Sequence, residues 1–452
     1  MRFLLLFVFS VLTGFPSYTQ SSYEVTFEGQ GQLFSDDESP FWMHTNYRGR
    51  LDEKSYLSGL ITSTARFDLS PKSYAELGLG ALYKDGYQNG VKLDELYFNF
   101  VSPKFGVVVG KKQREDLFQG LSATNESILW SLNAAPMPGI RFFIKDPLFL
   151  IDDHGIGIKA SLEEYLMDDE RYIPDTRVHH KSAHLVYRSK NNFQIDVGVQ
   201  HFVQWAGTSE EFGVLPGSFE DYIRIFTGMA SEGDVGNGQE VNALGNQIGS
   251  YELKIKTKIR DLDFRFIYNH IFEDASGMKG GNLPDGRYAV YFEDNRDAFW
   301  GTSWLKAFMY EFYYTKNQSR SRVSSEIDGA DNYFNNNLYR SGWTYNSQVL
   351  GVPFILLNDN NFRIGTNILT VHHLGMRGQL FDDYPYRFLL SYRKNYGVKG
   401  SFFPETKEIF SSLIEVELIN SNYNLKAQIG ADFKFQDNSN FGVGLNFSKT
   451  IF

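Results

Sequence analysis

The sequence predicts an all-β fold, namely a transmembrane antiparallel β-barrel. Three observations lead to this prediction. Apolar and polar residues alternate along many segments, a short secretory leader precedes them, and tight turns alternate with long connections along the chain. Because side chains on a strand switch face at every residue, this alternation is typical of strands with one apolar and one polar face.

The composition favours strands and turns over helices. Of 452 residues, 16% are aromatic and 41 are glycine, while hydrophobic residues reach 42%. Aromatic residues favour strands, and glycine disfavours helices. A mean hydropathy of −0.33 does not exclude a barrel, because only alternate residues face lipid. No linker marks a boundary, so residues 21–452 are expected to form one barrel with long extracellular loops.

Charge and cysteine content restrict the partners. The net charge of −10 argues against nucleic acid, whose phosphates are bound by Lys and Arg. It is compatible with a surface that meets neutral sugars, or that meets anionic groups through bound divalent cations. The chain has no cysteine, which excludes disulfides and thiolate metal sites. We expect no cofactor, no metal and a monomer that contacts outer-membrane lipid.

Residues 1–20 resemble a secretory signal peptide. Arg2 precedes an apolar core from Phe3 to Leu12, and small and turn-forming residues follow. This core is too short to span a bilayer as a helix. The mature chain is therefore expected to leave the cytoplasm by Sec-type export, and a membrane-embedded form must be a barrel in the outer membrane.

The segment from Ser250 to Glu273 shows the strand pattern most clearly. Tyr251 and Leu253 begin an apolar face, and charged residues occupy the other face. Each arm is about ten residues long, which is the length of a tilted strand that crosses a bilayer. The charged face, which is predicted to line a watery lumen, comprises Glu252, Lys254, Lys256, Lys258, Arg260, Asp263 and Arg265.

The same alternation recurs from the start of the mature chain to its end, and gives roughly 16 to 20 strands. The predicted strands lie near residues 23–33, 57–69, 74–83, 93–101, 105–110, 140–145, 148–159, 179–189, 193–204, 251–260, 263–270, 288–292, 300–315, 343–357, 362–372, 386–394, 412–419, 423–435 and 441–452.

The connections between these strands differ in length. Tight turns follow some strands, as at 70–72 and 102–104, whereas 111–139 and 205–246 are long. A short helix is expected within 111–139. Outer-membrane barrels have short periplasmic turns and long extracellular loops, whereas soluble sandwiches follow no such rule. The alternation of connection lengths therefore favours the barrel.

No catalytic or metal site is predicted. The pairs His179–His180 and His372–His373 look like metal ligands. Adjacent residues on a strand point to opposite faces, so the two histidines of a pair cannot coordinate the same ion. Carboxylate clusters such as Asp152–Asp153 lie in predicted loops or strand ends. A glycosidase needs two carboxyls held across a sugar, and no second element supplies such a pair, so we expect no enzyme.

Tryptophans give the best hypothesis for sugar binding, because aromatic faces pack against the CH faces of pyranose rings. Trp and Tyr also form belts at the edges of barrels, so packing is the competing interpretation. Arg neighbours would hydrogen-bond the sugar hydroxyls. The candidate polysaccharide-binding residues in or beside long connections are Trp130, Arg141, Trp205, Trp300 and Trp343.

Several segments, in order, resemble the capsule-assembly Wzi family of outer-membrane proteins. The ordered set covers most of the mature chain. The matching segments are SPFWMHTNYRGRLD (39–52), ILWSLNAAPMPGIR (128–141), QHFVQWAG (200–207), NALGNQIGSYELK (242–254), IYNHIFEDASGM (267–278), DNYFNNNLYRSGWTY (331–345) and VHHLGMRG (371–378).

The resemblance implies a barrel of about 18 strands, with helical content at the periplasmic side, and a lectin-like role in anchoring or assembling capsular or extracellular polysaccharide. A porin or solute channel is the alternative, since the same charged lumen face would suit a pore. A barrel enzyme that acts on lipid or glycan is a third interpretation, which the lack of a catalytic constellation disfavours.

Overall fold

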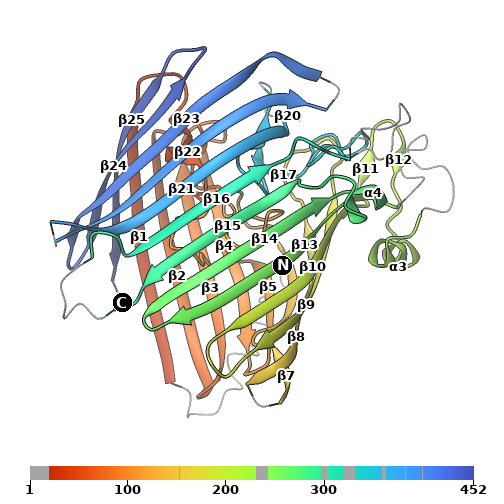
Figure 1. The fold of residues 1–452 in the computed structure, drawn as a ribbon, viewed down its shortest axis with the longest axis horizontal. Coiled ribbons are helices and arrows are strands. Elements are labelled where there is room, and N and C mark those ends of the chain that lie inside the picture. The colour runs from red at the N-terminus through yellow and green to blue at the C-terminus, as the bar shows by residue number, and fades with distance from the viewer. Residues whose placement is uncertain are drawn as a thin grey trace.

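The computed structural model describes residues 20–151, 153–230, 243–296, 303–319, 331–358, 363–381, 383–399 and 401–451. Its main sheet is a closed antiparallel barrel of 18 strands (Figure 1). The first strand pairs with the second and with the last, and this pairing closes the ring. The predicted fold class is therefore confirmed. Residues 1–19 of the predicted signal peptide (1–20) lie outside the described residues, and its last residue, Gln20, begins the first strand.

Two short strands, β6 and β7, both pair with β8 and together occupy one position in the ring. The barrel strands are β1 (Gln20–Phe34), β2 (Leu57–Ser70), β3 (Ser73–Lys84), β4 (Gly90–Val101), β5 (Phe105–Lys111), β6 (Gly139–Ile144), β7 (Leu148–Ile151), β8 (His154–Leu166), β9 (Arg177–Arg188), β10 (Gln194–Trp205), β13 (Asn246–Ile259), β14 (Leu262–Phe272), β15 (Gly286–Asp294), β16 (Ala307–Tyr314), β21 (Ile368–Leu380), β22 (Tyr384–Val398), β23 (Ser401–Asn420), β24 (Asn424–Lys434) and β25 (Asn440–Thr450).

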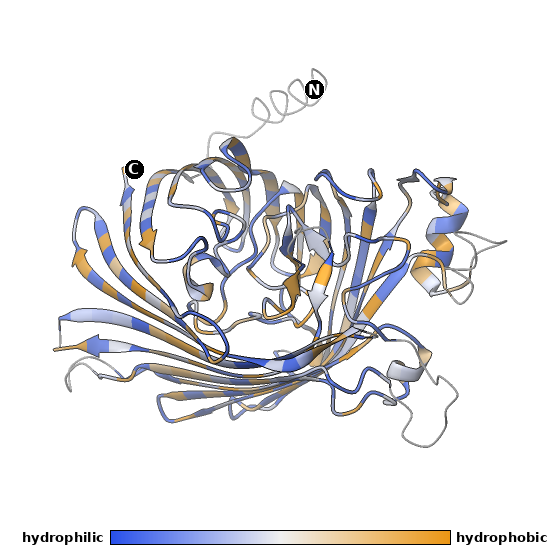
Figure 2. Ribbon diagram, turned by 90° about the horizontal axis from the view of Figure 1, so that it is seen from above, coloured by the Kyte–Doolittle hydropathy of each residue, from blue (hydrophilic) through white to orange (hydrophobic). Residues whose placement is uncertain are grey.

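The last strand, β25, shows how alternation produces the wall. Phe441, Val443 and Leu445 are exposed on the outer face, whereas Gly442 and Gly444 between them are buried on the inner face. An outer-membrane barrel needs such an apolar exterior, because lipid cannot hydrate polar groups. Figure 2 shows apolar and polar residues in alternation along many strands.

The connections separate the barrel into two ends. One end, here called the turn end, carries the short turns 71–72, 102–104, 189–193, 260–261 and 421–423. The other end, here called the loop end, carries the long connections 35–56, 112–138, 206–245 and 315–367. The predicted alternation of short and long connections is confirmed in part, because the short connections 85–89 and 435–439 also lie at the loop end and a long connection joins β15 and β16 at the turn end. Both the start of β1 and the end of β25 lie at the turn end.

Three of the long connections fold back into the barrel and fill part of the lumen (Figure 2). We call this lumenal filling the plug, and it comprises residues 35–56, 112–138, 331–358 and 363–367. Its apolar side chains pack with one another and with the inner wall. The largest include Trp42 and Met43 of helix α2 (Phe41–His44), together with Leu121, Trp130, Trp343 and Phe354.

Glycines on the inner wall make room for the plug. A Cβ on Gly375 of β21 would lie 2.5 Å from the backbone oxygen of Leu121, which is too close for any real side chain. A Cβ on Gly442 of β25 would lie 2.5 Å from the sulfur of Met43. Glycine in a strand commonly marks such a close approach. Small residues at these positions therefore let the plug pack directly on the wall.

Two local predictions are wrong. The predicted strand at 343–357 is instead part of the plug, with only the two-residue strands β17 (Thr344–Tyr345), β18 (Gln348–Val349) and β19 (Leu356–Leu357). Apolar residues of this segment are buried at both odd and even positions, so it lacks the alternation of inward and outward side chains that a barrel strand needs. The short helix expected within 111–139 is absent from these described residues, which form irregular plug backbone.

The described helices also correct the expectation of helical content at the periplasmic side. Helices α2, α3 (Phe219–Thr227) and α4 (Ala275–Met278) all belong to connections of the loop end, whereas the short turns of outer-membrane barrels are periplasmic. Ser218 caps α3, and Gly228 ends it with a φ of 71°. None of the helices among the described residues is long and apolar enough to span a bilayer.

Candidate functional site

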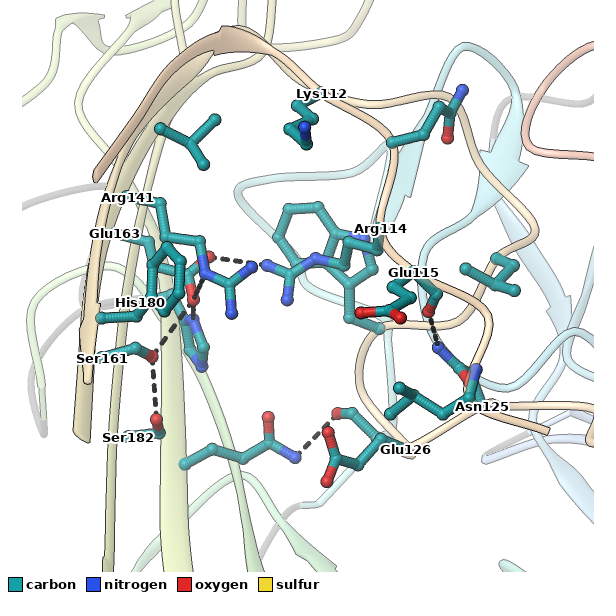
Figure 3. Close-up of a pocket in the computed structure, with 18 of the residues that line it drawn as sticks. Lys112, Arg114, Glu115, Asn125, Glu126, Arg141, Ser161, Glu163, His180 and Ser182 are labelled. Carbon is teal, nitrogen blue, oxygen red and sulfur yellow. Dashed lines mark hydrogen bonds and ion pairs between the residues drawn. The ribbon is translucent and has the colours of Figure 1, made fainter. Parts of the chain in front are cut away.

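A cavity with a volume of about 860 Å³ lies inside the barrel (Figure 3). Its walls come from β3 to β6, β8 to β10, β13 and β14, and the plug segment 112–138 forms its opposite side. The lining extends to Tyr74, Val101 and Lys145, which adjoin short turns. The cavity therefore runs from the turn end inward to the plug.

Glu163 on β8 is the centre of an ion-pair network that joins the plug to the wall. Its carboxylate lies 2.6 Å from a guanidinium nitrogen of Arg114, which belongs to the plug. It also lies 3.3 Å from Arg141 on β6 and 3.0 Å from His180 on β9 (Figure 3). Glu163 is almost completely buried, so these partners compensate for the loss of hydration of its charge.

A second network joins the plug to β13. Lys254 lies 2.9 Å from Glu126 of the plug and 3.0 Å from Glu252 on its own strand. The positive charge of Lys254 holds the pKa of Glu126 well below its usual range. Gln200 on β10 donates to Glu252 and also to Ser127 of the plug. Both acidic groups are thus engaged by Lys254.

His184 on β9 lies flat across Gly198 of β10. A Cβ on Gly198 would lie 2.2 Å from Nδ1 of this ring, so only glycine fits beneath it. In this position the ring lies 2.7 Å from Asp196 and 3.7 Å from Glu252. The carboxylate of Asp196 is therefore also engaged.

Several cations of the cavity lining have no carboxylate within 4 Å among the described residues. Lys159 on β8, Lys256 on β13 and Arg265 on β14 all line the cavity. Arg265 lies 5.6 Å and 5.3 Å from the ring centroids of Phe118 and Tyr291, which stabilises its charge only partly. The wall near the turn end is therefore positively charged.

The predicted lumen-facing residues separate into two groups. Glu252, Lys254, Lys256 and Arg265 line the cavity. The remaining three lie toward the 260–261 turn and outside the cavity lining. They are Lys258, Arg260 and Asp263. Arg260 has a φ of 56° in the turn itself, so its side chain does not follow the alternation of the strand.

The tryptophan candidates lie in different surroundings. Trp343 is 1% exposed and donates from its indole nitrogen to the backbone oxygen of Leu129 at 2.7 Å, inside the plug. Trp205 is 4% exposed and packs beneath α3 on the outer face of the wall. Neither indole has a free face for a sugar ring, so both are corrected to packing residues. Trp300 lies outside the described residues.

Trp130 and Arg141 do line the cavity. Trp130 is 7% exposed, and the guanidinium of Arg114 lies 4.1 Å from its ring centroid. Tyr165 covers another side of the ring at 5.1 Å. Arg141 is half-buried and stacks 4.5 Å above Phe143. Of the tryptophan candidates that the structure describes, Trp130 is the one placed beside the cavity.

The paired histidines point to opposite faces, as the alternation predicts. His180 and His373 face the interior, and His373 lies 2.9 Å from the backbone oxygen of Leu121. His179 and His372 face outward, where His372 lies 2.8 Å from the hydroxyl of Tyr310. No group of three or more potential metal ligands occurs among the described residues.

Several cavity residues were missed by the sequence analysis. Lys159 and Glu163 share the inward phase of β8, so the alternation between 154 and 166 contains the signal that locates them. Arg114 and Glu126 belong to the irregular plug, where no periodicity indicates which way a side chain points. Their partners depend on how the plug folds onto the wall.

A second cavity of about 610 Å³ lies beside the first. Its wall includes β1, β22, β23 and β24, and Arg48 and Asp116 of the plug line both cavities. Arg387 on β22 pairs with Glu415 on the neighbouring strand β23 at 3.3 Å. Plug residues therefore divide the inner space near the turn end into two compartments.

Sequence comparisons give no match to a protein-family model or to a curated protein. Among solved structures, the chain is similar to Wzi, an outer-membrane protein involved in group 1 capsule assembly in Escherichia coli and a carbohydrate-binding β-barrel. The TM-score is 0.59 at 13% identity, and the match covers 94% of this chain and 83% of that one.

Two further structures come from Pseudomonas aeruginosa. OccK5 (OpdH) has a TM-score of 0.47 at 10% identity, with 96% of this chain and 98% of that one covered. OprD has a TM-score of 0.47 at 8% identity, with 96% and 95% covered. At these identities the likeness to Wzi shows the fold alone. The chain shares the barrel fold of Wzi and is an outer-membrane β-barrel.

Proposed function

We propose that this outer-membrane barrel is a lectin-like protein that anchors capsular or extracellular polysaccharide at the cell surface or helps to assemble it. The observation that carries the proposal is the plug. Buried residues such as Trp343, Leu350 and Phe354 pack against one another and against the wall. A packed plug suits a rigid mount better than an open conduit.

The orientation follows from the connections. Outer-membrane barrels place short turns in the periplasm and long loops outside, so we assign the turn end to the periplasm and the loop end to the cell surface. The cavity then receives glycan from the periplasmic side. Trp130 and Arg141 provide an aromatic edge and a donor at its wall, and Wzi, a carbohydrate-binding barrel with the same fold, is consistent with this role.

The proposed role is binding and not catalysis. A glycosidase needs one carboxylic acid with a raised pKa and a second carboxylate across the sugar. In the cavity, Glu126 has a pKa held well below its usual range by Lys254, and Glu163 is engaged by three cationic or neutral nitrogen partners. These carboxylates are arranged to hold structure, which supports a non-enzymatic function.

The direct test uses polysaccharide purified from the same cells and the detergent-purified mature barrel. We expect saturable binding in isothermal titration calorimetry and no shortening of the polysaccharide on prolonged incubation. Absence of binding by a correctly folded barrel would refute the lectin role. Release of shorter chains would refute the non-enzymatic role.

A solute channel is the second candidate, because two charged cavities remain beside the plug. Single-channel recordings in planar bilayers separate the two functions. A plugged lectin should be nearly silent, whereas a channel should show steps of current that depend on the charge of the permeating ion.

A further inference from the structure

The wall of the larger cavity contains two positively charged side chains that face each other on neighbouring strands. Lys256 on β13 and Arg265 on β14 are directly opposite each other in the register, and both side chains face the lumen. Like charges that are directly opposite destabilise an antiparallel pair. Lys254, also on β13, and Lys159 on β8 line the same cavity. Pairings that destabilise a sheet in this way are expected at functional sites, where a bound ligand can offset the repulsion.

Carboxylates of the described residues form no ion pair within 4 Å with three cations of this wall, although the charge of Glu126 also acts on one of them, Lys256. Glu126 and Glu252 are both engaged by Lys254, and Asp196 is engaged by His184. Lys159, Lys256 and Arg265 have no ion-pair partner within 4 Å among the described residues. The excess of positive charge is local, because the whole chain carries a net charge of −10.

The neighbouring groups suit a sugar. Ser161 and Ser182 form a hydrogen-bonded pair of hydroxyls at 2.8 Å on the same wall, and Gln200 also lines the cavity. Trp130 and Arg141 lie farther from the turn end. Hydroxyl, amide and aromatic groups beside unpaired cations match a chain of sugars that carries carboxylates.

We infer that Lys159, Lys256 and Arg265 form a binding site for the carboxylates of an acidic polysaccharide, which enters the cavity from the turn end. This inference rests on the proposed function and adds the class of glycan. Each cation would form a charge-assisted hydrogen bond with a uronate carboxylate, and the bound anion would relieve the repulsion between Lys256 and Arg265.

The test compares two oligosaccharides of equal length, the anionic hexagalacturonate and the neutral maltohexaose. The detergent-purified mature barrel should bind hexagalacturonate more tightly than maltohexaose. The double variant Lys256→Gln/Arg265→Gln should weaken binding of hexagalacturonate by about tenfold or more, since a hydrogen bond to a charged group contributes about 1.5–3 kcal/mol. Higher ionic strength should weaken it as well.

Two matched variants control for the fold and for charge. Lys258→Gln removes a lysine from the same strand outside the cavity lining, and should leave binding unchanged. Lys256→Arg/Arg265→Lys keeps both charges and should retain the preference for the anionic probe. Equal loss in the Lys258→Gln variant, or loss in the charge-conserving variant, would overturn the assignment of these two residues.

The outcome also separates this inference from the proposed function. If the barrel binds its cells' own polysaccharide but prefers maltohexaose to hexagalacturonate, the acidic-glycan site is refuted and the lectin role stands. If the barrel binds no polysaccharide at all, the proposed lectin function is refuted, and the acidic-glycan site is refuted with it. Equal affinity for the two probes at low ionic strength would likewise contradict the site.

Discussion

At the scale of single residues, Glu163 shows how a side chain can hold the plug to the wall. It has partners on three different elements, namely Arg114 of the plug, Arg141 on β6 and His180 on β9. A buried ion pair adds little net stability by itself, but removal of one partner leaves the others buried and uncompensated. Removal of the Glu163 charge should therefore destabilise the folded protein more than removal of one exposed charge would.

The Glu163→Gln variant tests this point. It leaves Arg114 and Arg141 without their counter-charge, and we expect a loss of about 3 kcal/mol in the free energy of unfolding. Urea unfolding of the refolded barrel in lipid vesicles, followed by tryptophan fluorescence, measures it. Glu417→Gln is the matched control, because Glu417 lines the second cavity and has no cation within 4 Å among the described residues. Equal stability of the two variants would contradict the role of Glu163.

A second residue, Glu273, makes stability depend on pH. It follows β14 at the loop end, outside the spanning strands. Burial, and then the nearby charge of Asp331, raise the pKa of Glu273 to about 8 from an ordinary value of 4.5, although backbone N–H groups of Asn332 and Phe334 donate to it. The native state therefore binds a proton that the unfolded chain has released.

The sign of the pH effect follows from linkage. Because the pKa is raised in the folded protein, the contribution to stability is fully present below pH 4.5 and is lost as the pH rises toward 8. We expect the midpoint temperature of thermal unfolding to decrease as the pH is raised from 5 to 8. The Glu273→Gln variant should show a smaller fall. An equal fall in both proteins would remove Glu273 as the cause.

The residues that sequence reasoning found and missed differ in one physical respect. Lys254, Lys256 and Arg265 lie on regular strands, where the period of two fixes which face a side chain takes. Trp205 and Trp343 were placed correctly in or beside long connections, but their burial depends on where those connections fold. The hydrophobic effect draws large aromatic rings inward, so position in a loop does not imply exposure.

At the scale of elements, the strands were predictable and the plug was not. In β25 the alternation specifies an outer face of Phe441, Val443 and Leu445 and an inner face of small residues. The segment 343–357 contains an apolar run with strand-like composition, yet it packs as plug because apolar partners surround it. A local pattern cannot distinguish a strand that faces lipid from a segment buried on all sides.

The fit between plug and wall gives a prediction for Gly375. Any side chain there collides with the backbone of Leu121, and overpacking of this kind costs roughly 1–3 kcal/mol. The Gly375→Val variant should displace residues 112–138 and raise single-channel conductance above that of the wild type. Gly31→Val is the control, since a Cβ on Gly31 meets no atom within 4 Å. Unchanged conductance in Gly375→Val, with the fold intact, would show that this contact does not hold the plug.

At the scale of the whole molecule, one chain combines a membrane anchor with a folded interior. The apolar exterior places it in the bilayer, and the long connections, which would otherwise project from the loop end, partly turn inward and pack. The interior that remains is divided into compartments lined by charged and polar groups. Such a molecule is suited to hold a polymer at the membrane and poorly suited to pass solutes quickly.

The comparison of cell-bound and shed polysaccharide in cells with and without the gene tests the central claim most directly. If the barrel holds polysaccharide at the surface, deletion should move polysaccharide from the cell-bound to the shed fraction while the total stays the same, and re-expression of the wild type should restore retention. An unchanged distribution in the deletion strain, with normal synthesis, would contradict the account.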